Sequence, residues 1–184
     1  SWNWDLSLWE NPETGLVRLL LSGGTVLYHY PDRRDPLNST YLRDERGGQL
    51  IREADGRFTY TAGNDHVYIF EPHDAEDVRP WYRLARYEVP TGQNVELRYL
   101  GDLLHAIEHV DGPCMVFEWT DPGVGPRPRI KTVHGAGGSC IDPEACALDP
   151  LRCGRKIEYA YDDAGVHLIS AAPAPHRIFE YEYT

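Results

Sequence analysis

The chain has 184 residues, and 29 acidic against 18 basic side chains give it a formal net charge of −11. This charge repels the phosphates of nucleic acids and of anionic lipids, which excludes both as main partners. Hydrophobic residues make up 41% of the chain, enough for a folded core, yet no apolar run approaches the roughly 20 residues of a membrane-spanning helix.

Short runs in which apolar or aromatic residues alternate with polar ones predict β-strands along most of the chain. Turn-forming pairs such as Asp55-Gly56 and Thr91-Gly92 separate the runs, as in hairpins. The fold class is therefore predicted as all-β, built from consecutive antiparallel hairpins. In chain order the predicted strands are Thr25–Tyr30, Arg57–Tyr60, His66–Phe70, Trp81–Tyr87, Asn94–Tyr99, Leu103–Val110, Met115–Trp119, Arg129–Val133, Lys156–Tyr161 and Ile178–Tyr183.

Two segments also admit a helix. Within Asp102–Val110 the apolar residues fit one face of a helix, but the segment lies between two strand runs, so we favour a strand. A short helix over Pro143–Leu151 is a second alternative, because Asp142 has the side chain of an N-cap and proline is favoured at the first helical position.

A repeating unit organises these strands: one strand, a glycine turn, and a second strand that ends in an aromatic residue. Tyr99 and Trp119 close two such units 20 residues apart, Tyr161 follows 42 residues later, and Tyr183 a further 22. The excess length before Tyr161 is a Gly- and Cys-rich stretch, 135–154, interpreted as an insertion loop. Repeats of this kind predict one β-rich region over 1–184, a curved sheet in which each hairpin stacks on the next.

The phrase Tyr159-Ala160-Tyr161-Asp162-Asp163-Ala164-Gly165, followed by the apolar Val166–Ile169, resembles the signature of the YD-repeat (Rhs) family. The segments Arg57–Tyr60, His66–Pro72, Tyr82–Tyr87 and Gly92–Tyr99 are similar to the N-terminal portion of that family's shell region. The resemblance covers most of residues 20–184.

This resemblance implies a β-sheet that spirals into a hollow shell around a C-terminal polymorphic toxin, which the shell protects and helps deliver in interbacterial competition. A related shell lies outside the cell in animal teneurins. The chain would then be a non-catalytic fragment of a larger shell, made in the bacterial cytoplasm and later secreted or delivered. Its partners would be the remainder of the shell, the toxin cargo and, through open sheet edges, other copies. Because Asp121–Gly125 departs from the family's autoproteolysis motif, no catalytic residue is carried over, and no cofactor is expected.

One group of residues has the side chains of a metal site. His134, Cys140, Cys146 and Cys153 are spaced by 6, 6 and 7 residues and offer the three thiolates and one imidazole that Zn²⁺ accepts. The two-to-four-residue spacing typical of structural zinc sites is missing, so a disulfide or free thiols are favoured over zinc.

Other residues admit sites of a more general kind. His105 and His109 are four residues apart, and Glu96, Glu118, Glu158, Glu180 and Glu182 recur at polar strand positions, where two facing carboxylates would resemble a glycosidase pair. Packed or solvated side chains are favoured for all of them. The cluster Trp2, Trp4 and Trp9 supports an alternative function, a β-sandwich or barrel that binds a glycan or a protein. A small zinc-stabilised module is the remaining alternative.

Overall fold

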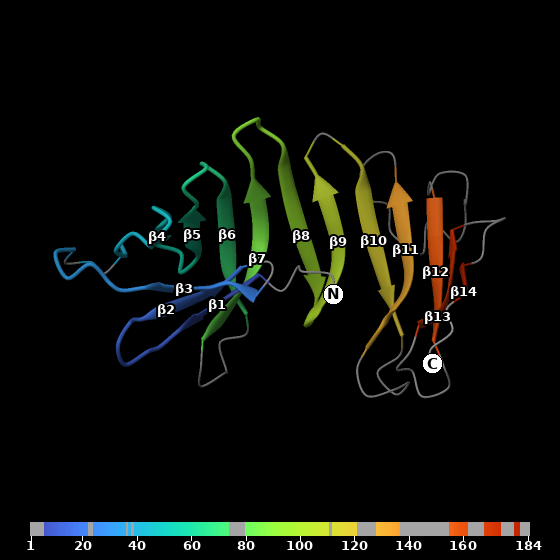
Figure 1. Ribbon diagram of the computed structural model, residues 1–184, viewed down its shortest axis with the longest axis horizontal. Coiled ribbons are helices and arrows are strands. Elements are labelled where there is room, and N and C mark those ends of the chain that lie inside the picture. Colours follow the sequence, from blue (N-terminus) through green and yellow to red (C-terminus); the bar gives the residue numbers. More distant parts are fainter. Residues whose placement is uncertain are drawn as a thin grey trace. The chain divides into compact units, whose positions relative to one another are not determined.

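The computed structural model describes residues 6–21, 24–35, 37, 39–73, 80–110, 112–120, 128–136, 155–161, 168–173 and 179–180. The chain divides into two compact units, residues 1–96 and 97–184. Figure 1 labels the strands and colours them in chain order. The all-β prediction is confirmed: the described residues form strands that pair antiparallel with their neighbours, and none of them lies in an α-helix. Accordingly, no helix in this part of the chain has the length and apolar character needed to cross a membrane.

The first unit contains seven complete strands and the beginning of an eighth. They are β1 (Ser7–Glu10), β2 (Val17–Leu20), β3 (Val26–His29), β4 (Gln49–Arg52), β5 (Phe58–Thr61), β6 (Val67–His73), β7 (Trp81–Glu88) and β8 (Asn94–Leu100), the last of which continues into the second unit.

Strand β7 is the branch point of the first unit. One of its edges pairs with β6 along the whole strand, whereas the other pairs with β1 at Trp81–Arg83 and with β8 at Arg86–Glu88. From β7 the ladder therefore runs one way through β1, β2 and β3, and the other way through β6, β5 and β4.

The core of the first unit is made of aliphatic and aromatic side chains from both arms of this ladder. Phe58 packs edge-on against Tyr41 and Tyr82, with ring centroids 5.8 and 4.7 Å apart. The fully buried residues of this core are Leu8, Val17, Leu19, Leu50, Phe58, Phe70 and Leu84.

The second unit is a succession of hairpins. After the end of β8 come β9 (Leu103–His109), β10 (Cys114–Trp119), β11 (Ile130–Ala136), β12 (Arg155–Tyr161), β13 (Leu168–Pro173) and β14 (Phe179–Glu180). From β9 to β14, each strand pairs with the strand that follows it in the chain. A small buried cluster of Ala106, Cys114 and Val116 joins β9 to β10.

Most predicted strands occur where the alternation places them, and the ambiguous segment after Asp102 is the strand β9. The predicted alternating runs did not include β1, β2 and β4, which have four residues each, or β13, where only the resemblance placed the apolar Val166–Ile169. Strand β11 extends through Ala136, two residues into the stretch interpreted as a loop, because Gly135 pairs with Arg155. The remainder of that stretch, with the alternative helix at 143–151, lies outside the described residues.

Candidate functional site: the seams between hairpins

Two hairpins of the second unit are closed by the same contact. Trp119, the last residue of β10, donates its indole N–H to the carbonyl oxygen of Leu104 near the start of β9, at 2.8 Å. Tyr161, the last residue of β12, donates its hydroxyl to the carbonyl oxygen of Ile130 at the start of β11, also at 2.8 Å. The aromatic residue that ends each second strand therefore ties that strand back to the beginning of its hairpin.

The pairing between the second strand of one hairpin and the first strand of the next is called a seam below. The seams β6–β7, β10–β11 and β12–β13 each contain one register shift. The pairings inside the hairpins β5–β6, β7–β8, β9–β10, β11–β12 and β13–β14 continue without one, and so does the pairing of β4 with β5. Immediately after each shift an aromatic residue lies opposite an aliphatic residue of the next strand. These pairs are Phe70 with Leu84, Trp119 with Ile130, and Tyr161 with Leu168.

The repeated shift has a physical consequence. A β-bulge bends the strand that carries it and increases the local right-handed twist. In the seams that follow Trp119 and Tyr161, the extra residues are Lys131 and Ile169, both on the first strand of the next hairpin. The same local rotation is thereby introduced at equivalent places 42 residues apart, as a stacked repeat requires.

The predicted metal ligands fall mostly outside the described residues, which include His134 but not Cys140, Cys146 or Cys153. The imidazole of His134 lies on β11, with Nε2 3.2 Å from Oε1 of Glu118 on the neighbouring strand. Within the described part of the chain, no three His, Cys, Asp or Glu side chains are placed to hold a metal ion. The zinc prediction therefore remains a prediction.

Cys114 is the one cysteine of the chain that does not belong to the predicted zinc ligands. Cys114 is fully buried and disulfide-bonded, and its partner lies outside the described residues. Cys114 and His134 lie on the same face of the sheet. His134 lies directly opposite Val116 across the seam, and Cys114 is two residues before Val116 on β10. An even number of cysteines was the only sequence signal for its pairing, since Cys114 is remote from the other three.

The other candidate pairs are also placed. His105 and His109 both lie on β9, where a separation of four residues means about 13 Å, too far to share one metal ion. Glu118 and Glu158 both lie opposite Thr132, one on each side of β11.

A basic side chain lies beside each of these carboxylates. Glu118 faces His134, and Glu158 lies 2.5 Å from Nζ of Lys156. The hydrogen bond from Lys156 and its charge hold the pKa of Glu158 below its usual value. A glycosidase acid needs the opposite, a raised pKa. Of the remaining glutamates, Glu96 lies 3.9 Å from Arg86, while Glu182 and the side chain of Glu180 are outside the described residues.

Two buried polar clusters in the first unit were not predicted. In the first, Arg52 of β4 donates to Oε1 of Glu10 in β1 at 2.9 Å, and the hydroxyl of Tyr82 donates to Oε2 at 3.1 Å. The side chain of Glu10 is only 9% exposed, so the guanidinium and the hydroxyl replace its hydration. Burial and the charge of Glu10 raise the pKa of the nearby Tyr41 to about 12.

The second cluster joins His29 of β3, Asp44 and Tyr60 of β5. Tyr60 donates its hydroxyl to Oδ2 of Asp44 at 2.7 Å, and backbone N–H groups of Arg46 and Gly48 donate to Oδ1 at 2.8 Å. Burial favours a higher pKa for Asp44, but these hydrogen bonds outweigh burial and the pKa is lowered. A side chain at Gly48 would collide with the Tyr60 hydroxyl, since a Cβ there lies 2.3 Å from it.

The imidazole of His29 is fully buried beside this carboxylate. Its Nε2 lies 3.8 Å from Oδ2 of Asp44, beyond hydrogen-bond distance, and its ring packs edge-on against Tyr60. Burial outweighs the attraction of Asp44 and lowers the pKa of His29. Because the His29 and Asp44 side chains are 0% and 2% exposed, the cluster is closed to solvent in this structure, and its evident role is to hold the segment around Asp44 against the sheet.

No protein-family model matches the chain, and no curated protein sequence matches it either.

Proposed function

We propose that the chain is a non-catalytic structural segment of a YD-repeat shell that encloses a C-terminal polymorphic toxin and helps to deliver it. The observation that supports this most is the repeated hairpin closure, an aromatic at the end of the second strand bonded back to the first, with a register shift at the following seam. Such a unit suits a wall of stacked hairpins, in which each hairpin covers its edge by pairing with the next one.

The proposal also gives the chain its partners and its location. The rest of the shell would continue the sheet, and the toxin would lie against one of its faces. The protein would be made in the bacterial cytoplasm and would then be secreted or delivered with its cargo. The supporting sequence features are the Tyr161-Asp162 dipeptide and the strand pattern around it.

The test begins with the complete open reading frame that contains these residues. Further Tyr-Asp repeats followed by a variable C-terminal region are expected, and a frame without them overturns the proposal. The full-length protein is then treated with protease, with and without the double substitution Trp119→Leu and Tyr161→Leu. A C-terminal region that is resistant in the wild type and in the exposed-site control Met115→Ala, but cleaved in the double variant, is the expected result. Equal cleavage in all three proteins would count against an enclosing shell.

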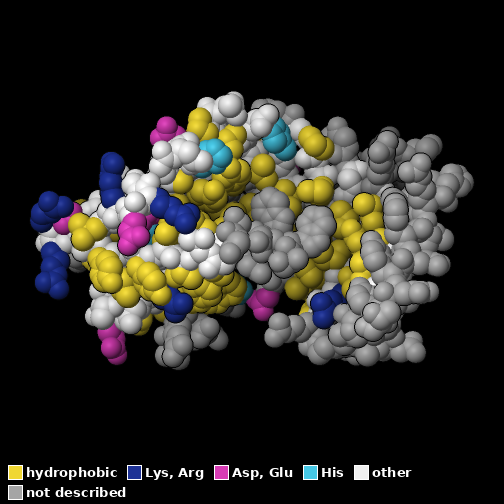
Figure 2. Space-filling view, viewed as in Figure 1, with side chains coloured by type: hydrophobic (Ala, Val, Ile, Leu, Met, Phe, Trp, Pro, Cys, Tyr) yellow, Lys and Arg dark blue, Asp and Glu magenta, His cyan; other side chains and the backbone are white. Residues whose placement is uncertain are grey.

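A glycan-binding module is a second candidate, and one row of side chains favours it. Trp81, Trp9, Arg18 and Tyr28 lie directly opposite one another on the adjacent strands β7, β1, β2 and β3. Trp9 is 36% and Tyr28 50% exposed, and the Arg18 guanidinium carbon lies 5.9 Å from the centre of the Tyr28 ring. Hydrophobic side chains gather over these strands in the space-filling view (Figure 2). Exposed aromatic rings beside a guanidinium offer apolar faces and hydrogen-bond donors to a sugar chain.

This candidate is tested by titrating a panel of neutral and acidic oligosaccharides while tryptophan fluorescence and heat of binding are recorded. Saturable binding that Trp9→Ala abolishes and Met115→Ala leaves unchanged would support a glycan-binding face. Absence of binding across the panel would remove the candidate and leave the shell proposal unaffected.

A further inference from the structure

The two arms of the first unit's sheet each end in an edge, and a short segment of the chain lies between them. Strands β3 and β4 do not pair with each other. Residues 39–42, called the edge segment here, run between β4 and the three residues that follow β3. The bridges Pro31–Tyr41 and Thr40–Ile51 mark its two sides.

Backbone hydrogen bonds join the edge segment to both edges. Toward β4, the N–H of Arg52 donates to the carbonyl oxygen of Ser39 at 2.7 Å, and the N–H of Tyr41 donates to that of Leu50 at 3.2 Å. On the other side, the N–H of Leu42 donates to the carbonyl oxygen of Tyr30 at 2.8 Å, and the N–H of Asp32 to that of Thr40 at 2.9 Å. The segment thus uses the polar groups that an unpaired edge offers to another strand.

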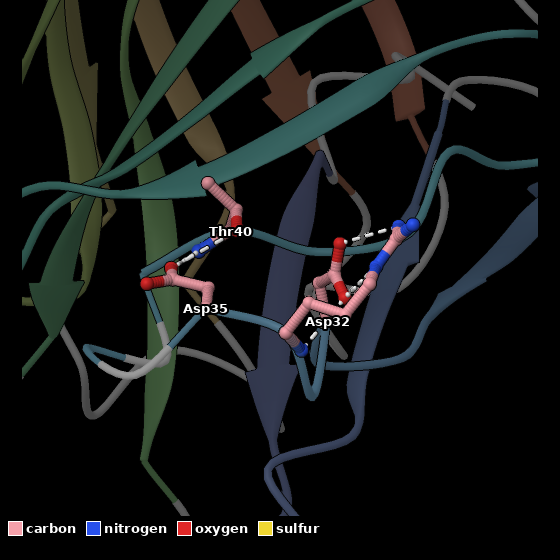
Figure 3. Close-up of polar contacts among 4 residues, drawn as sticks. Asp32, Asp35 and Thr40 are labelled. Atoms are coloured by element: carbon pink, nitrogen blue, oxygen red, sulfur yellow. Dashed lines mark hydrogen bonds and ion pairs between the residues drawn. The ribbon is translucent and has the colours of Figure 1, made fainter.

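Side chains hold the edge segment at its beginning. A single oxygen of Asp35, Oδ2, accepts the N–H groups of Ser39 and Thr40, both at 2.8 Å, and their hydroxyls at 2.7 and 3.0 Å. Figure 3 shows the contacts between Asp35 and Thr40. At the other end the chain turns at Asp44, which is bonded to Tyr60 and Gly48 as described above. Between these two anchors, the ring of Tyr41 is buried against Phe58.

From this arrangement we infer that the outer edge of β4 is a strand-pairing surface, and that the edge segment, held by Asp35, keeps a second copy of the chain from adding to it. The partner that fits is an extended backbone with free N–H and carbonyl groups. The β4 edge of a second copy, uncovered in the same way, supplies such a backbone. The inference concerns the first unit alone and holds whether or not the chain belongs to a shell.

A matched pair of variants tests the role of Asp35. Asp35→Ala removes the acceptor of the four bonds, whereas Asp55→Ala removes an equal charge from a carboxylate whose described hydrogen bonds all come from Arg57 and which has no described contact with the edge segment. Amide exchange of Tyr41, Leu42 and Arg52 is expected to be at least tenfold faster in Asp35→Ala and unchanged in Asp55→Ala. Unchanged exchange in Asp35→Ala would show that Asp35 does not hold the segment and would overturn the inference.

The partner is tested by sedimentation of both variants over a hundredfold range of concentration. Asp35→Ala is expected to self-associate more strongly than the wild type, with new exchange protection at Gln49–Arg52 in the associated form. A synthetic peptide of residues 37–43 is expected to suppress this association, and a scrambled peptide is not. The inference would be overturned if the amides of the edge segment exchange faster in Asp35→Ala but the variant does not self-associate. It would also be overturned if the associated form gains exchange protection at residues other than Gln49–Arg52. If Asp35→Ala does not fold, the milder double variant Ser39→Ala and Thr40→Val, which removes only the two hydroxyl bonds, takes its place.

Discussion

The two units reach the same secondary structure by different means. In the first, polar contacts connect strands far apart in the sequence, as between Glu10 and Tyr82, 72 residues apart, and large aromatic rings fill the interior. Among the described residues of the second, the aromatic closures connect successive strands, and one buried cluster consists of the small side chains Ala106, Cys114 and Val116. The difference indicates that the first unit derives its stability from its own interior. The second is built like a repeat, whose stability is a sum of contacts between neighbours.

The largest effect is expected from Phe58→Ala in the first unit. Phe58 is fully buried between Tyr41 and Tyr82, and removing a ring from such a place costs about 3–5 kcal/mol of unfolding free energy. Denaturant unfolding measures the loss, with the exposed-site variant Leu37→Ala as the control. Amide exchange should show the loss in β4–β6 and leave β11–β12 protected. Equal loss of exchange protection in both units would contradict the conclusion that the first unit derives its stability from its own interior.

A smaller loss is expected when the cation beside Glu10 is removed. Arg52→Leu leaves the nearly buried carboxylate of Glu10 with only the Tyr82 hydroxyl, which should cost about 1–3 kcal/mol. Arg57→Leu is the matched control, because its partner Asp55 is half exposed and such surface pairs contribute only about 0–1 kcal/mol. Equal losses in the two variants would mean that burial of Glu10 contributes nothing.

The sequence could predict features that depend on the local alternation of residues. It could not predict features that depend on contacts between distant residues. Alternation located β5 to β12, because runs such as Met115–Trp119 carry the period of two that a half-buried strand imposes. The alternation did not reveal β1, β2 and β4, although β3 and β5 have four residues as well, so strand length alone does not explain the difference. The aromatic residues that end β10 and β12 were recognised as a repeat, whereas their bonds to Leu104 and Ile130 depend on strand register.

The buried polar clusters of the first unit could not be predicted from the sequence for a related reason. His29, Asp44 and Tyr60 come from β3, a turn and β5, and only the folding of the segment between β3 and β4 brings them together. Nothing near His29 in the sequence indicates that its ring lies beside Asp44 and Tyr60. The same holds for Cys114, because no residue near it in the sequence indicates that it is disulfide-bonded.

In the second unit, single hydrogen bonds at the ends of hairpins should have modest and local effects. Trp119→Phe and Tyr161→Phe each delete one donor to a strand carbonyl, for a loss of about 0.5–1.5 kcal/mol in unfolding free energy. Hydrogen exchange at β9 should rise in the first variant and at β11 in the second, with Tyr30→Phe, an exposed tyrosine of the first unit, as the control. Loss of protection across every strand of the second unit would show that its hairpins do not behave as separable repeats.

The smallest effect is expected from pH acting on His29 in the first unit. Burial lowers the pKa of His29 in the folded state, so below the unfolded value of 6.5 the unfolded chain binds a proton that the folded chain does not. The neutral His29 ring therefore makes its full contribution to the free energy of unfolding above pH 6.5. This contribution decreases as the pH falls, and at pH 6 the decrease is less than about 1 kcal/mol. His29→Leu should flatten the decline between pH 7.5 and 5.5, whereas the exposed-site variant Leu37→Ala should leave it as in the wild type. Both are followed by denaturant unfolding at each pH. A decline that persists in His29→Leu would assign it to other groups, and would separate the buried polar cluster from the pH dependence of the first unit.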